Sequence, residues 1–189
     1  MTTSEAVFGQ YVNPEQSPPP LSRMAVQLLP LDMIVQWKRC GQTADYIASY
    51  LAYHFRDFGR AMNVLSTVLN ELIENAVKFS SDKQHPIRLA AHFFGDNLLL
   101  ESTNSIREDS DKSFREFVGR LFNEDFDDMF VAQVEHSAEF DTELTQLGLI
   151  TLKNDYVSGM GVRFHRNGDA RSREVAVQLR LDTDDPDLS

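Results

Sequence analysis

The feature that most constrains this sequence is a long amphipathic segment over residues 59–80. Its apolar side chains recur at steps of three and four residues, which is the spacing of one buried stripe on an α-helix. A polar run, Ser80-Ser81-Asp82, then ends the pattern. The segment therefore predicts a long helix with one face turned to the core. The stripe consists of Leu65, Val68, Leu69, Leu72, Ile73 and Ala76.

Hydrophobic patterns on either side of this helix predict the rest of the secondary structure. Pro30 suggests a break in the first extended segment, and Gly95-Asp96 predicts a tight turn between two strands. A second turn is expected at 167–169. The expected elements are an extended segment over 24–37, helices over 42–56, 111–137 and 142–155, and strands over 87–94, 97–103, 157–165 and 172–181.

This order of elements predicts an α+β fold. We expect a two-layer α/β sandwich in which helices cover one face of a mostly antiparallel sheet. Residues 1–22 are expected to form a flexible N-terminal arm, because a run of three prolines follows a polar stretch. Residues 23–181 are expected to form a single domain, and residues 182–189 an acidic C-terminal tail.

The charge balance excludes several classes of partner. The chain has 189 residues, and its 29 acidic residues against 18 basic ones give a formal net charge of -11. That balance argues against nucleic acid and against an anionic membrane surface. No apolar run has the roughly 18–20 residues of a membrane span, and the N-terminus lacks the charged and apolar regions of a signal peptide. With Cys40 as the single cysteine, we expect a cytoplasmic protein.

Three polar side chains lie along one strip of the long predicted helix. Glu71 and Asn75 are four residues apart, and Lys78 is three further on, so they line an edge beside the apolar stripe. A carboxamide oxygen suits magnesium, a carboxylate can accept a proton, and an ammonium group can balance phosphate charge. Such a set fits a magnesium nucleotide. The alternative is an ordinary solvated helix face, on which this spacing is common.

The ten residues from Glu71 to Ser80, Glu-Leu-Ile-Glu-Asn-Ala-Val-Lys-Phe-Ser, closely resemble the N box of the GHKL (Bergerat-fold) ATPases. That family includes sensor kinases and anti-sigma-factor kinases. The resemblance implies a Bergerat fold over roughly residues 25–181 that binds ATP and Mg²⁺. It implies that Asn75 is the metal ligand, that Glu71 is the general base, and that Lys78 contacts phosphate.

The two glycine-rich boxes of that family are degenerate in this chain. At the G1 position, Asn104 stands about where an aspartate would accept a hydrogen bond from adenine, and the bulky Ile106 follows. At the G2 position a single glycine remains, Gly148, followed by Leu149. The resemblance implies that Asn104 contacts adenine and that Gly148 and Leu149 belong to the phosphate loop. A helix containing one ordinary glycine is the alternative for the latter pair.

Within the family, this chain, with its altered G1 and G2 positions, most resembles the SiaB-type and anti-sigma-factor Ser/Thr kinases. This resemblance implies a Mg-ATP-dependent kinase that acts on a small partner protein in a partner-switching circuit, and a possible homodimer by analogy. The alternative is an interaction module that regulates through protein contacts without ATP turnover. A small-molecule enzyme has no supporting motif beyond the N box.

Two further groups of residues have simpler explanations. The five histidines show no metal-ligand spacing. A run of phenylalanines on a charged helix is expected to belong to the core rather than to a partner-docking surface. These are Phe114, Phe117, Phe122, Phe126 and Phe130.

Overall fold

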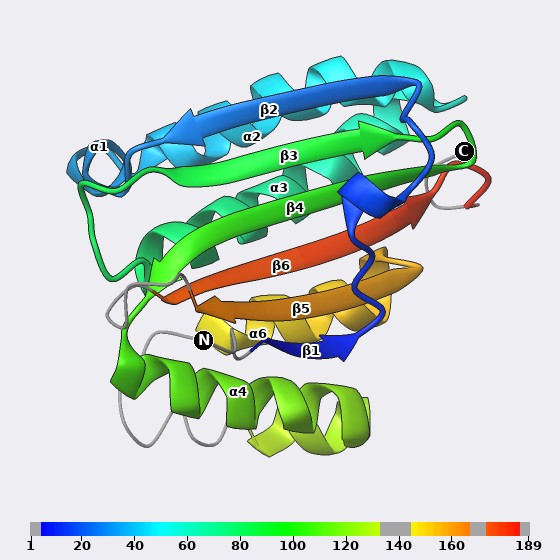
Figure 1. Cartoon of the computed structure of the whole chain (residues 1–189). Helices are drawn as coiled ribbons and strands as arrows, with labels where there is room; N and C mark the ends of the chain where they lie inside the picture. Colours follow the sequence, from blue (N-terminus) through cyan, green and yellow to red (C-terminus); the bar gives the residue numbers. More distant parts are fainter. Residues whose placement is uncertain (1–4, 133–144, 167–172, 186–189) are drawn as a thin grey trace.

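The protein consists of a six-stranded antiparallel sheet with helices packed on one face and a further helix along the edge formed by its first strand (Figure 1). The structure is a computed structural model, which describes residues 5–132, 145–166 and 173–185. The strand order is β1-β5-β6-β4-β3-β2, and every neighbouring pair is antiparallel. The predicted α+β sandwich is therefore confirmed. The strands are β1 (Ala6–Gly9), β2 (Ser22–Leu28), β3 (Ile87–Phe93), β4 (Asn97–Ile106), β5 (Gly159–Arg166) and β6 (Arg173–Asp182).

The predicted long helix is α3 (Phe58–Phe79), and it packs against α2 on one side and β4 on another. Asp57 caps its first turn, where Oδ1 accepts a hydrogen bond from the backbone N–H of Arg60 at 3.0 Å. Its apolar stripe is at most 2% exposed, as predicted. The other helices are α1 (Pro30–Val35), α2 (Lys38–Leu51), α4 (Glu108–Asn123) and α6 (Thr145–Thr151), which continues as the π-helix η3 (Leu152–Tyr156). Two short 3₁₀ helices, η1 (Pro14–Gln16) and η2 (Ala52–His54), and a helical stretch over 126–132 complete the set in the described residues.

The N-terminal residues depart from the predicted loose arm. Residues 6–9 form β1, which pairs with β5 in the register Ala6↔Phe164 to Gly9↔Gly161. The segment from residue 10 to residue 20 then crosses the sheet face that α2 and α3 leave open and leads into β2 (Figure 1). A strand of four residues is too short to stand out by alternation, and its partner lies more than 150 positions along the chain, so local pattern did not reveal it.

Two boundaries also differ from the sequence-based expectation. The extended segment expected over 24–37 ends at Leu28, because Pro30 starts α1 instead of merely interrupting a strand. The helix expected over 111–137 is divided, since α4 ends at Asn123 and helical structure resumes at 126. The turn expected at 167–169 and residues 186–189 of the expected tail lie outside the described residues.

The core lies between α3 and the covered face of the sheet. The phenylalanine run belongs largely to this core, because Phe114 and Phe117 are buried and Phe122 and Phe126 pack against it, while Phe130 is 38% exposed. Across the described ranges, helices of sufficient length and hydropathy to cross a membrane are absent. The result is one continuous apolar layer beneath the sheet, with the polar edge of α3 beside it.

Candidate functional site

Glu71 and Asn75 lie one turn apart on α3, at the edge of its buried stripe. Asn75 is only 7% exposed, and Glu71 is partly buried. The helix holds both because its apolar stripe is fixed against the sheet, which leaves this edge facing α6. The expected pairing of a carboxylate and a carboxamide on one strip is therefore present in the structure.

Gly148 of α6 sits directly against this pair. A Cβ added to Gly148 would overlap Oε2 of Glu71 and would lie 2.9 Å from its Cδ and 3.7 Å from Nδ2 of Asn75. No larger residue fits at this position unless Glu71 or α6 moves. The helix carrying Gly148 is thus brought onto the helix carrying Glu71 and Asn75, although more than 70 residues separate them in sequence.

Asn75 also borders a small cavity between α3 and the sheet. The cavity has a volume of about 10 Å³, which is room for one water molecule at most. Nδ2 of Asn75 is buried and has no hydrogen-bond partner in the described part of the chain. Other lining residues include Ser102, Asn104, Ile106, Phe114 and Leu149.

The structure therefore brings Asn104 and Leu149 to the same cavity as Asn75. Asn104 is 5% exposed, and its Nδ2 donates to the carbonyl oxygen of Ser105 at 3.0 Å. Ile106 is buried and occupies part of the space beside Asn104. An adenine ring does not fit in a cavity of this size, so a nucleotide would require the elements around it to separate.

Lys78 points away from this cavity. Its Nζ lies 3.6 Å from Oε2 of Glu74 and 5.4 Å from the centre of the Trp37 ring. It does not line the cavity at Asn75. The side chain therefore shares the strip of Glu71 and Asn75 but turns toward the junction of α1 and α2.

Lys83 is a residue that the sequence reasoning missed. Its Nζ donates to the carbonyl oxygens of Val77 at 2.7 Å and Lys78 at 3.1 Å in the last turn of α3. Burial lowers the pKa of Lys83. A basic residue just beyond a helix end was the available signal, since it can satisfy the last carbonyls.

The environment of Glu71 favours its neutral form. Burial raises the pKa of the Glu71 carboxyl, the negative charge of Glu74 raises it further, and Lys78 acts in the opposite direction. A carboxylate with a raised pKa accepts a proton more readily at neutral pH than an exposed one. Glu71 is thus suited to proton transfer.

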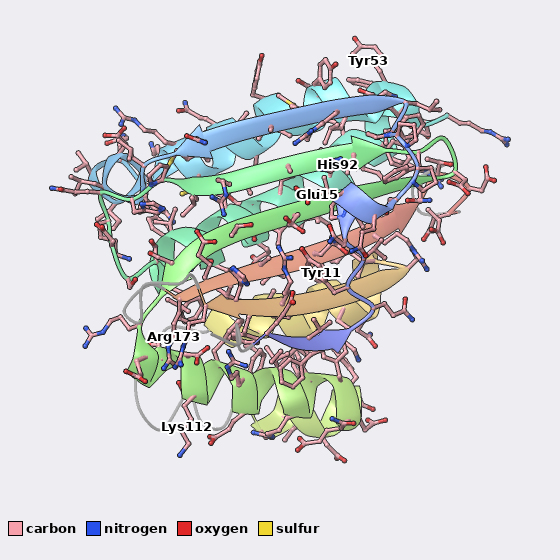
Figure 2. The ribbon with its side chains drawn as sticks, in the orientation of Figure 1. Tyr11, Glu15, Tyr53, His92, Lys112 and Arg173 are labelled. Carbon is pink, nitrogen blue, oxygen red and sulfur yellow. The ribbon has the colours of Figure 1, made fainter. Side chains whose placement is uncertain are left out.

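A cluster of ion pairs holds α4 to the sheet. Asp111 is 4% exposed and receives hydrogen bonds from Arg115, at 2.9 Å, and from Arg173 of β6. Arg173 also pairs with Glu108. Figure 2 shows Arg173 at the end of β6 that faces α4. The acidic residues of this segment are therefore partly neutralised by arginines, which the sequence pattern did not show.

The oxygen ligands at this site suit magnesium by their chemistry. The carboxamide oxygen of the buried Asn75 and the partly buried carboxylate of Glu71 are oxygen ligands of the kind that magnesium accepts. In the described ranges, groups of three or more His, Cys, Asp or Glu placed to hold a metal are absent. Asn75 could thus supply one ligand, with the remainder coming from phosphate and water.

Comparisons with known proteins bear on the fold. Neither a protein-family model nor a curated protein sequence matches this chain. A chain in the crystal structure of the SiaB-SiaC complex from Pseudomonas aeruginosa superimposes with a TM-score of 0.57 at 12% identity, over 84% of this chain and 89% of that chain. The likeness spans nearly the whole of both chains, and this protein therefore has the fold of a chain in that complex.

Proposed function

We propose that this chain is a regulatory protein of SiaB type, a Mg-ATP-dependent Ser/Thr protein kinase whose substrate is a small partner protein. One observation carries the proposal: Asn75, whose buried Nδ2 lacks a hydrogen-bond partner in the described residues, lies beside Glu71 and against Gly148. The similarity of Glu71 to Ser80 to a nucleotide-binding motif supports it. The shared fold with a chain of the SiaB-SiaC complex supports a small protein partner.

The proposal gives each residue a distinct role. Glu71 accepts the proton of a partner hydroxyl, and its raised pKa suits that transfer. Asn75 supplies an oxygen to Mg²⁺, and the backbone of Gly148 and Leu149 faces phosphate. Asn104 accepts a hydrogen bond from adenine. Bound Mg-ATP supplies the phosphoryl group and the charge neutralisation that its transfer requires.

The small volume of the cavity favours a second candidate function. About 10 Å³ beside Asn75 is far less than a nucleotide needs, and Ile106 and Leu149 both border the cavity. An interaction module that never opens would keep this packing and regulate by protein contacts alone. The two candidates therefore differ in whether α6 and α4 separate from α3.

Titration calorimetry with ATP, with and without Mg²⁺, tests the proposal. We expect magnesium-dependent binding that Asn75→Ala abolishes. Glu71→Gln is expected to retain binding, because it removes only the proton acceptor. Arg56→Gln, a change of an exposed side chain between η2 and α3, serves as the control.

Phosphate transfer is the second measurement. Radiolabelled ATP and a co-purified small partner should give a phosphorylated Ser or Thr with the native protein and no label with Glu71→Gln. Absence of heat and of thermal shift up to millimolar Mg-ATP would overturn the kinase proposal in favour of the interaction module.

A further inference from the structure

A second cavity lies on the opposite face of the sheet from Asn75. Its floor includes Glu101 and Thr103 of β4, whereas the cavity at Asn75 is lined by Ser102 and Asn104. Successive side chains of a strand point to opposite faces, so the two cavities are separated by the sheet itself. The second cavity has a volume of about 660 Å³, within the range of sites for small molecules.

The segment over 10–20 forms one wall of this groove and is held in place by specific bonds. The Tyr11 hydroxyl donates to Oε2 of Glu101 at 2.8 Å. The side chain of Gln178 accepts from the backbone N–H of Val12 at 2.8 Å and donates to its carbonyl oxygen at 2.9 Å. Figure 2 shows Tyr11 and Glu15 on this segment in front of the sheet, with His92 on the strand behind. The wall is therefore built into the fold.

Three arginines border the groove, although the chain as a whole has a formal net charge of -11. They are Arg23, Arg88 and Arg163, and the acids Glu15 and Glu101 also line it. The structure gives Arg23 no acidic partner among the residues it describes. The buried Nε of Arg163 likewise finds no acceptor within the described ranges.

Arg88 forms an ion pair that uses only part of its hydrogen-bond donors. Only its Nη2 contacts Glu174, at 3.2 Å to each carboxylate oxygen, and a guanidinium carries five N–H groups. The groove thus offers cationic donors that the described part of the protein does not fully use. Arg23 and Arg88 are exposed, and a guanidinium forms its strongest hydrogen bonds with anionic acceptors.

The strand register sets the distance between the two charged ends. Arg23 pairs with His92, Ala25 with Ala90, and Gln27 with Arg88. Arg23 and Arg88 therefore lie on neighbouring strands about four residues apart along them, roughly 13 Å between backbone positions. The two alanines between them leave an open, flat floor. This separation suits an elongated molecule with an anionic group at each end.

We propose that this groove binds a small elongated organic dianion, with one anionic group at Arg23, the other at Arg88, and its body over Ala25 and Ala90. Arg163 provides a third cation at the border of the same groove. The anionic groups can be phosphates or carboxylates. This site is independent of the proposed ATP site, because the sheet lies between them.

Calorimetry with two probes tests the proposal and distinguishes the two sources of charge. Fructose 1,6-bisphosphate serves as the probe with two phosphate groups and sebacate as the dicarboxylate. We expect submillimolar binding of one of them, at least tenfold weaker in Arg23→Gln and in Arg88→Gln. Arg56→Gln and Asn75→Ala should bind it as the native protein does. Tighter binding of either probe identifies the anionic group that the site prefers.

Three results would overturn the proposal. The first is the absence of binding of both probes up to 5 mM, and the second is binding that Arg23→Gln leaves unchanged. The third is a stable dimer in light scattering that Arg23→Gln dissociates, which would make the groove a contact between two copies. Asn75→Ala should lose ATP binding and keep dianion binding. The result for the groove can therefore be distinguished from the result for the proposed kinase activity.

Discussion

Gly148 lies so close to Glu71 that a methyl group on the glycine would overlap the carboxylate and come within 2.9 Å of its Cδ. The relationship joins α6 to α3 at the site where the kinase proposal puts chemistry. It also makes the spacing of these two helices sensitive to a single added carbon atom.

A double-mutant cycle between these residues measures that sensitivity. Alanine is favoured over glycine inside a helix by about 1 kcal/mol. In a Glu71→Ala background, Gly148→Ala should raise the free energy of unfolding by roughly that amount. In the native background the gain should vanish or reverse, because Glu71 must be displaced. Urea unfolding of the four proteins gives the coupling, and equal effects in both backgrounds would contradict the contact.

Asn75→Leu should stabilise the protein while removing nucleotide binding. Leucine has the same number of side-chain heavy atoms as asparagine but no buried amide that needs a partner. Removing an unsatisfied buried polar group is worth about 1–2 kcal/mol. Chemical denaturation measures the change, with Leu72→Ala as a control that should destabilise by about 2–5 kcal/mol through a core cavity. A loss of stability in Asn75→Leu would show that the amide is satisfied.

Stability should depend on pH through Glu71. Its pKa is raised in the folded state, so the folded protein holds a proton more tightly than the unfolded chain. The contribution of Glu71 to stability is therefore greatest below its unfolded pKa and is lost as the pH rises through the folded pKa. Glu71→Gln should gain stability relative to the native protein as the pH rises above about 4.5.

The control for this experiment is a glutamate with the opposite shift. A hydrogen bond from Arg120 lowers the pKa of Glu124, which is exposed on the far end of α4. Glu124→Gln should therefore be slightly less stable than the native protein at neutral pH, and this difference should disappear as the pH falls and Glu124 takes up its proton. Unfolding curves between pH 4 and pH 8 compare the two variants, and parallel curves for both would refute the assigned burial of Glu71.

Asp111→Ala should loosen α4 from the sheet. The change leaves Arg173 and Arg115 without their shared buried partner, and breaking such a pair costs about 3–5 kcal/mol. Hydrogen exchange of the α4 amides should rise with the loss of stability. Glu124→Ala, which breaks an exposed pair on the same helix, should have little effect. Equal effects of the two variants would argue against the cluster as the anchor.

The sequence was sufficient to predict α3 and the general architecture, because a long apolar stripe and alternating strands are local signals. The pairing of Glu71 with Asn75 was visible for the same reason. The contact with Gly148 was not, since periodicity says nothing about which helices meet. The resemblance to a known motif pointed to both residues, but it implied phosphate contacts rather than a glycine packed on the carboxylate.

Other features depend on cross-strand register and could not be read locally. The groove residues Arg23, Arg88 and Arg163 come from three strands that are distant in sequence. They are brought to one face only by the antiparallel pairing of β2, β3 and β5 with their neighbours. Lys78, by contrast, was placed on the expected strip, but its flexible side chain turns to Glu74 and Trp37.

Gly161 should prove necessary for seating the segment over 10–20. A Cβ at this position would overlap the backbone of Tyr11 and lie 2.8 Å from the carbonyl carbon of Gln10. Gly161→Ala is therefore expected to displace the segment. Hydrogen exchange should then be faster at the N–H of Val12, which donates a hydrogen bond to the side chain of Gln178. Unchanged protection of that amide would contradict the close approach.

The pairing of β1 with β5 has a practical consequence for how the chain tolerates shortening. Removal of the first 20 residues would strip a partner from β5 and leave its backbone N–H and C=O groups facing solvent. Exposed strand edges of this kind recruit other chains. Such a shortened protein should self-associate and precipitate during purification. By pairing with β5, β1 therefore protects the protein from aggregation.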